Sequence, residues 1–133
     1  MTINRINPES LHDTPGYHHM TVVDAGRLAF LAGQCPLLPD GTLAGPDLAT
    51  QVDQVVANTL AVLAAVKAGP EHVVRTVIYV VSDDNVVLAE VWRRLTASRL
   101  GPAFSTASTL LGVVQLGFTG QLAELDVTAA LPD

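Results

Sequence analysis

The sequence has little positive charge and a single cysteine. Its 133 residues include seven Lys and Arg against thirteen Asp and Glu, which gives a formal net charge of −6. So few cations leave no basic stripe that could neutralise a phosphate backbone, and the composition therefore argues against nucleic acid as a partner. Cys35 has no second cysteine with which to form an internal disulfide, and this favours a reducing cytoplasm.

Long apolar runs are missing too. Asn58 and Thr59 interrupt the longest hydrophobic stretch before it reaches the roughly 18 residues that a membrane span needs. The polar start of the chain, residues 1–5, lacks the apolar core of a signal peptide. We therefore expect no association with a membrane.

The common catalytic signatures are also absent. The chain contains no G-x-x-x-x-G-K-[ST] phosphate loop, no G-x-G-x-x-G dinucleotide fingerprint and no G-x-S-x-G nucleophile turn. Its histidines lack the spacing of metal ligands, because the adjacent His18 and His19 would point to opposite faces of a strand. Cys35 is expected to behave as a small buried hydrophobe, since no basic residue beside it favours a thiolate. We expect neither a metal nor a cofactor.

Apolar residues, by contrast, are abundant. Hydrophobic residues make up 49% of the chain and charged residues only 15%, which is more apolar surface than a small monomer usually needs to bury. The length fits one domain over residues 1–133. Part of the apolar surface is therefore expected to face another copy of the chain.

Two β-rich segments near the start predict a hairpin. Thr21–Asp24 and Leu28–Gly33 are separated by Ala25-Gly26, where glycine supplies the positive φ that tight turns need.

Two amphipathic helices are predicted after the hairpin. Asp47 is expected to cap the first helix, which stops at Gly69-Pro70, and Ser82 or Asp83 is expected to cap the second, which ends before Gly101-Pro102. The apolar positions recur at three- and four-residue spacing; they are Val52, Val55, Val56, Leu60, Leu63 and Val66 in the first helix and Val87, Leu88, Val91, Trp92 and Leu95 in the second.

Three further strands complete the expected sheet. Val73–Val81 is typical of a central strand covered on both faces, and strands are also predicted near Phe104–Leu111 and over Leu122–Ala130. Right-handed crossovers would place both helices on one side of a single sheet. The bare face would then be buried in a homo-oligomer.

Segments across nearly the whole chain resemble the Rid (reactive intermediate deaminase) family in order and spacing. These segments are Ile6-Asn7-Pro8, Gly16-Tyr17-His18-His19, the run from Gly26 to Gln34, the helix start Asp47–Asn58 with Gln51, Val73–Val80, Gly101-Pro102-Ala103 and Glu124-Leu125-Asp126. The resemblance implies an α/β (α+β) fold of the chorismate-mutase-like kind, in which one mixed sheet carries two helices on one face. It also implies a homotrimer whose clefts lie between subunits.

The resemblance further implies a site for small molecules. Typical members hydrolyse enamines and imines to keto acids and ammonia without a cofactor, using residues that match Tyr17, Gly33 and Glu124 here. Glu124 would then orient or deprotonate a water, while the Tyr17 hydroxyl and the backbone near Gly33 hold the substrate. Without the resemblance, Glu124 would be taken as a solvated strand residue and Tyr17 as an ordinary interface residue.

The chain departs from the family at the residue after Pro102-Ala103. Typical deaminases have an arginine there, whose planar fork grips the substrate carboxylate, whereas this chain has Phe104. Thr106 also replaces a cysteine found in many relatives. We therefore expect a substrate pocket that includes Ala103, Phe104, Thr106 and Leu110 and suits a more apolar substrate than a 2-imino acid.

Three functions remain open from the sequence. The first is an enzyme that hydrolyses, condenses or cyclises a small imine, enamine or carbonyl compound at Glu124. The second is a trimer that binds a small molecule without turnover. The third, a ribonuclease activity attributed to some relatives, is disfavoured by the acidic charge.

Overall fold

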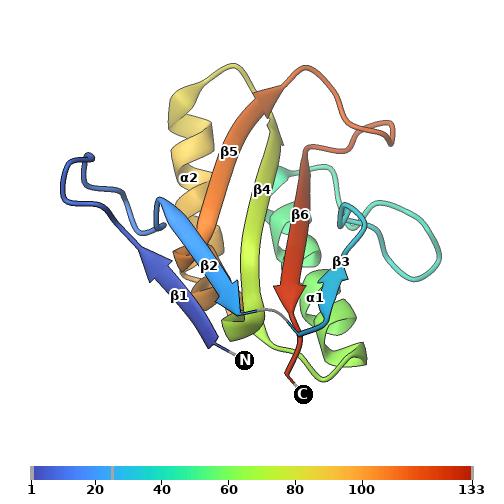
Figure 1. Cartoon of the computed structure of the whole chain (residues 1–133). Helices are drawn as coiled ribbons and strands as arrows, with labels where there is room; N and C mark the ends of the chain where they lie inside the picture. Colours follow the sequence, from blue (N-terminus) through green and yellow to red (C-terminus); the bar gives the residue numbers. More distant parts are fainter. Residues whose placement is uncertain (1, 25, 133) are drawn as a thin grey trace.

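A four-stranded mixed sheet forms the centre of the computed structural model, which describes residues 2–24 and 26–132 (Figure 1). The strands lie in the order β3 (Leu28–Phe30), β6 (Ala123–Ala130), β4 (Val73–Val81) and β5 (Ala107–Val113). β4 and β5 run parallel, whereas β6 is antiparallel to both β3 and β4. The prediction of a mixed sheet is confirmed.

Both helices cover the same face of this sheet (Figure 1), as predicted. α1 (Leu48–Ala65) begins where the Asp47 carboxylate accepts a hydrogen bond from the backbone N–H of Thr50 at 2.9 Å, so the predicted cap is confirmed. α2 (Asn85–Thr96) is capped by Asp84 instead of Ser82 or Asp83. The Ser82 hydroxyl accepts from the Asp84 backbone, which places the capping carboxylate one residue later than expected.

Each helix ends several residues before the Gly-Pro pair that was expected to stop it. Lys67 adopts a left-handed φ of 58° just after α1, and this ends the helix at Ala65. The prolines instead open two short 3₁₀ helices, η1 (Pro70–His72) and η2 (Gly101–Ser105). The second of these occupies the start of the strand predicted near Phe104–Leu111.

The predicted hairpin is wrong. β2 (Met20–Asp24) pairs antiparallel with a strand that the sequence analysis missed, β1 (Thr2–Ile6), whereas β3 pairs with β6. Because β1 satisfies the backbone of β2, the two segments joined at Ala25-Gly26 belong to different sheets. Ala25 itself lies outside the described residues.

The core lies between the helices and the sheet. Alternate residues of β4 and β6 are buried against the helices, and the predicted inward face of the last strand is confirmed; those residues are Ala123, Leu125, Val127 and Ala129. Only one face of β4 is covered, however, since its other residues are half-buried or exposed. The expectation of a strand covered on both faces is therefore wrong for the isolated chain.

The uncovered face carries large apolar side chains. Phe30 of β3 is 76% exposed, and Leu28 of β3 and Leu111 of β5 are also exposed. Apolar surface of this extent usually meets another protein surface.

α1 is long and apolar enough to cross a membrane by length and composition alone. Its Val52, Val55 and Leu63 side chains are buried in the core, and the helix packs against β6 and α2. Amphipathic helices in protein cores can have the same length and the same apolar composition. These two properties therefore do not distinguish α1 from such a core helix.

Candidate functional site

The carboxylate of Glu124 is held in a defined position on the uncovered face of the sheet. Its Oε1 atom accepts hydrogen bonds from the Gln121 side-chain amide at 3.1 Å and from the Cys35 thiol at 3.2 Å. On the neighbouring strand β4, Tyr79 lies directly opposite Glu124. This carboxylate is therefore an ordered group rather than a freely solvated strand residue.

Gly33 lies against the other oxygen of the carboxylate. After β3 the chain continues along β6, where Gln34 and Leu125 exchange backbone hydrogen bonds of 2.7 and 3.1 Å. A Cβ atom added to Gly33 would lie only 2.4 Å from Glu124 Oε2. Any larger residue at position 33 would displace the carboxylate, so the two predicted residues Gly33 and Glu124 are indeed brought together.

Two buried glutamines fix the turn that precedes β6. Gln51 of α1 donates to the backbone oxygens of Gly45 and Gly120 and accepts from the backbone N–H of Leu122 at 2.7 Å. Gln121, only 3% exposed, then reaches Glu124 from this turn. Helix α1 therefore sets the position of the carboxylate through backbone contacts, a role that sequence analysis did not assign to Gln51 or Gln121.

Cys35 is a protonated donor to Glu124. Three causes together raise the pKa of the Cys35 thiol to about 11. The largest is burial, and the hydrogen bond to Glu124 and the negative charge of Glu124 add to it. The thiol therefore stays neutral at physiological pH, which agrees with the expectation that it is no activated nucleophile. Its position beside Glu124 was not anticipated, because 89 residues separate the two in the chain.

Removing the charge of Glu124 should make Cys35 more reactive. In a Glu124→Gln protein the thiolate no longer faces a carboxylate, so the pKa of Cys35 falls from about 11 and the alkylation rate near neutral pH rises several-fold. Mass spectrometry after iodoacetamide treatment measures this rate at several pH values, and Cys35 is the only cysteine. The matched control is Asp126→Asn, on the same face of β6. An unchanged rate in Glu124→Gln would show that the carboxylate does not contact the thiol.

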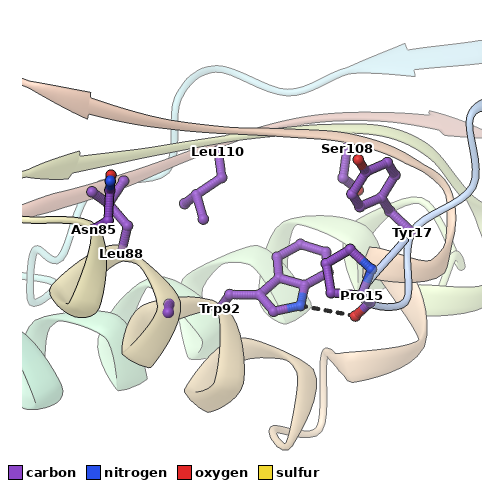
Figure 2. A pocket seen from close by; sticks show the side chains of 8 residues that line it. Pro15, Tyr17, Asn85, Leu88, Trp92, Ser108 and Leu110 are labelled. Atoms are coloured by element: carbon purple, nitrogen blue, oxygen red, sulfur yellow. Dashed lines mark hydrogen bonds between the residues drawn. The ribbon is translucent and has the colours of Figure 1, made fainter. Parts of the chain in front are cut away.

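A second candidate element is an apolar pocket of about 340 Å³ between α2, β5 and the segment before β2 (Figure 2). The residues that line it are Pro15, Tyr17, Asn85, Leu88, Ala89, Trp92, Ser108 and Leu110. The indole N–H of Trp92 donates to the carbonyl oxygen of Pro15 at 3.2 Å, which ties the Tyr17 segment to α2. Tyr17 and Leu110, both expected near a substrate, line this pocket. Trp92 lines it as well, although its spacing had placed it only in the apolar stripe of the second helix.

Phe104 lies behind this pocket and not in its lining. The ring is 1% exposed and packs edge-to-face against Trp92, with 5.9 Å between the ring centroids. The expectation that Phe104 lines the pocket beside Leu110 is corrected accordingly, because η2 directs the ring into the core. Ala103 and Thr106 are also fully buried, so any effect of these three residues on a ligand is exerted through the pocket wall.

Tyr17 and Glu124 lie on opposite faces of the sheet. The pocket residues Ser108 and Leu110 pair with Thr76 and Ile78 of β4, which are buried beneath the helices. Glu124 pairs instead with Tyr79, whose side chain alternates to the uncovered face. A single chain therefore does not bring the pocket and the carboxylate together.

No group of three or more potential metal-ligating side chains occurs among residues 2–24 and 26–132.

Comparison with known proteins identifies the family. The sequence profile of the Endoribonuclease L-PSP family matches residues 9–131. A Rid-family protein of unknown function from Yersinia pestis, YyfB, is 32% identical over 98% of this chain and 100% of its own, with a TM-score of 0.87. A YjgF-family protein from Neisseria meningitidis, 24% identical over 100% of this chain and 98% of its own, has the same fold with a TM-score of 0.61.

A curated relative is similar over a shorter segment. Protein DfrA of Myxococcus xanthus is 41% identical over 64 residues, which is 47% of this chain and 49% of DfrA. The match therefore spans about half the length of that relative. The profile match and the YyfB likeness, by contrast, each cover nearly the whole chain. The chain accordingly belongs to the Endoribonuclease L-PSP family, which includes the conserved Rid proteins.

Proposed function

We propose that the protein is a Rid-type enzyme that hydrolyses a small neutral imine or enamine, or acts on a related carbonyl compound. The observation that carries this proposal is the Glu124 carboxylate, whose Oε1 is held by Gln121 and Cys35 while Oε2 lies beside Gly33. Such a carboxylate can orient a water and accept its proton in a site that needs no cofactor.

The hydrolysis requires one water for each C=N bond. As the water oxygen bonds to the imine carbon, Glu124 accepts a proton from it and then returns that proton to the nitrogen. The carbinolamine hydroxyl then gives its proton to Glu124, which passes it to the amino nitrogen. As the C–N bond breaks, the C=O bond forms, and the products are a carbonyl compound and ammonia. Tyr17 and the backbone near Gly33 would hold the substrate, as in the relatives that the sequence resembles.

A neutral substrate is favoured by what surrounds the pocket. None of its eight lining residues carries a formal charge, and the family arginine is replaced by the buried ring of Phe104. A substrate carboxylate would lose its hydration without gaining a charged partner, at a cost of a few kcal/mol. The typical 2-imino-acid activity is therefore not expected.

The proposal includes assembly into a homotrimer. The exposed apolar side chains of the uncovered face, Phe30 and Leu111 among them, favour association with further copies. Because Tyr17 and Glu124 lie on opposite faces of one sheet, the pocket of one subunit would be completed by Glu124 of another. The reduced Cys35 thiol suits a cytoplasmic protein.

Two imines that differ by a single carboxylate test the substrate class. We expect kcat/KM for the imine of propylamine to exceed that for 2-iminobutanoate at least about a hundredfold. Each imine is generated in place by an oxidase, and ammonia release above the spontaneous rate is followed. Faster turnover of 2-iminobutanoate would contradict the proposal, because another group would then have to bind the carboxylate.

Ribonuclease activity is not supported for this chain, although some relatives with the same fold are named endoribonucleases. Its net charge of −6, with only seven Lys and Arg, opposes binding of a polyanion. Binding without turnover is the remaining alternative. It predicts that the wild-type protein has no imine-hydrolysing activity and that a substitution at Glu124 leaves ligand affinity unchanged.

A further inference from the structure

We infer that the pocket beside Trp92 binds an uncharged aromatic ring, so that the substrate class narrows to neutral aryl imines and aryl carbonyl compounds. This inference rests on the proposed function for the identity of the reacting group. The binding of the ring itself rests only on the eight lining residues of the pocket, all of which one chain supplies.

The first observation is the arrangement of the aromatic side chains. The rings of Tyr17 and Trp92 are nearly perpendicular, with an interplanar angle of 87° and 6.2 Å between their centroids. They lie on one side of the pocket, while Leu88 and Leu110 lie across it (Figure 2). The two rings are already in edge-to-face contact with each other, so a third ring would lie between this aromatic pair and the two leucines. There it can contact both aromatic rings in the edge-to-face or offset geometries that aromatic pairs prefer.

The second observation is that this wall is already fixed. The indole N–H of Trp92 is bonded to Pro15, and the Phe104 ring packs against the indole from the core side. This hydrogen bond and this ring contact therefore hold the Trp92 ring in one orientation before a ligand binds. Because the wall is preformed, binding costs less side-chain conformational entropy. Flat, rigid ligands, which also lose little conformational entropy of their own, should gain the most affinity from such a wall.

The third observation concerns polarity. The Ser108 hydroxyl is already hydrogen-bonded to the Thr76 hydroxyl at 2.6 Å and to the Thr106 backbone oxygen at 3.1 Å. Asn85, at the first turn of α2, is exposed and lines the pocket with an amide that can both donate and accept. Asn85 and the Tyr17 hydroxyl are thus the polar groups that face a ligand at an otherwise apolar site, which matches a ring that carries a single carbonyl or C=N group.

Benzamide and benzoate form a matched pair of probes, because they share a ring and differ in charge. We expect benzamide to bind the wild-type protein in isothermal titration and to shift the indole Nε1–H resonance of Trp92, the only tryptophan. Benzoate should bind at least about tenfold more weakly. Equal affinity for the two probes, or an unmoved indole resonance at saturation, would overturn the inference.

Variants locate the binding. Trp92→Leu removes the aromatic wall, and Ala89→Phe fills the pocket from an exposed helix position that should not disturb the fold. Each should weaken benzamide binding at least about fivefold. The control Phe118→Leu, an exposed ring outside the pocket, should bind as the wild type does. Unchanged affinity in Ala89→Phe would place the ligand elsewhere and contradict the inference.

The two proposals fail separately. Intact benzamide binding without turnover of any imine would reject the proposed enzyme and keep the aromatic pocket. Turnover of the propylamine imine together with absent benzamide binding would do the reverse.

Discussion

A Glu124→Gln protein should fold like the wild type and lose at least about a hundredfold of its kcat on a neutral imine. Glutamine keeps the length of the side chain and retains an oxygen for the Gln121 and Cys35 donors, but it cannot accept a proton from water. Steady-state ammonia release measures the loss, and benzamide affinity should not change.

The control for this variant is Asp126→Asn, which removes the same charge from the same face of β6 two residues away. Its side chain contacts neither Gln121 nor Cys35 in the hydrogen-bond pattern of the described residues. We expect near wild-type turnover. An equal loss in both variants would mean that the overall negative field matters, and unchanged turnover in Glu124→Gln would remove Glu124 from the mechanism.

A Phe104→Arg protein, which restores the family arginine, should be destabilised by about 4 kcal/mol or more and should not gain imino-acid deaminase activity. The ring is 1% exposed and packs against Trp92, so a guanidinium there would be buried without a described anionic partner. Urea unfolding followed by circular dichroism measures the change in the free energy of unfolding.

Phe104→Leu is the matched variant, because it keeps an apolar side chain of smaller volume. The expected cost is about 1–2 kcal/mol for the lost contacts with Trp92 and the small cavity. If Phe104→Arg instead had wild-type stability, position 104 would have access to solvent or to an acidic partner. In that case the phenyl ring would be an exchangeable part of the ligand site.

Local signals allowed much of the fold to be predicted. Asp47 could be predicted as the cap of α1, because an Asp side chain just before an amphipathic run can accept a hydrogen bond from a free backbone N–H of the first helical turn. The alternation in β6 gave its buried face, since the side-chain period of a strand is fixed by geometry. These features depend on neighbouring residues, and no distant contact overrides them.

The errors arose where distant segments compete. β2 could pair with the strand before it or the strand after it in the sequence. Its actual partner β1 contains the polar Asn4, and the sequence analysis therefore did not predict β1 as a strand. Phe104 was assigned to a strand because its β propensity was considered without the η2 turn that Gly101 and Pro102 open.

The candidate site was only half visible in the sequence. The resemblance supplied Gly33 and Glu124, and the structure places them in contact. The donors Gln121 and Cys35, and the aromatic wall of Trp92, follow from tertiary contacts that no local pattern encodes. A buried glutamine beside a turn, such as Gln121, is the one signal that a closer look at polarity could have found.

We propose that the pocket of one subunit works with Glu124 of another. The Glu124→Gln protein is expected to be inactive, and the Ala89→Phe protein to keep at most about one fifth of the wild-type kcat/KM on a neutral aryl imine. The two can be co-expressed with different tags and the mixed trimers purified through both tags. In every mixed trimer, one of the three sites would combine an intact pocket from the Glu124→Gln parent with Glu124 from the Ala89→Phe parent, so kcat/KM should rise to at least about one third of wild type. Mixed trimers no more active than the Ala89→Phe parent would contradict a site shared between subunits.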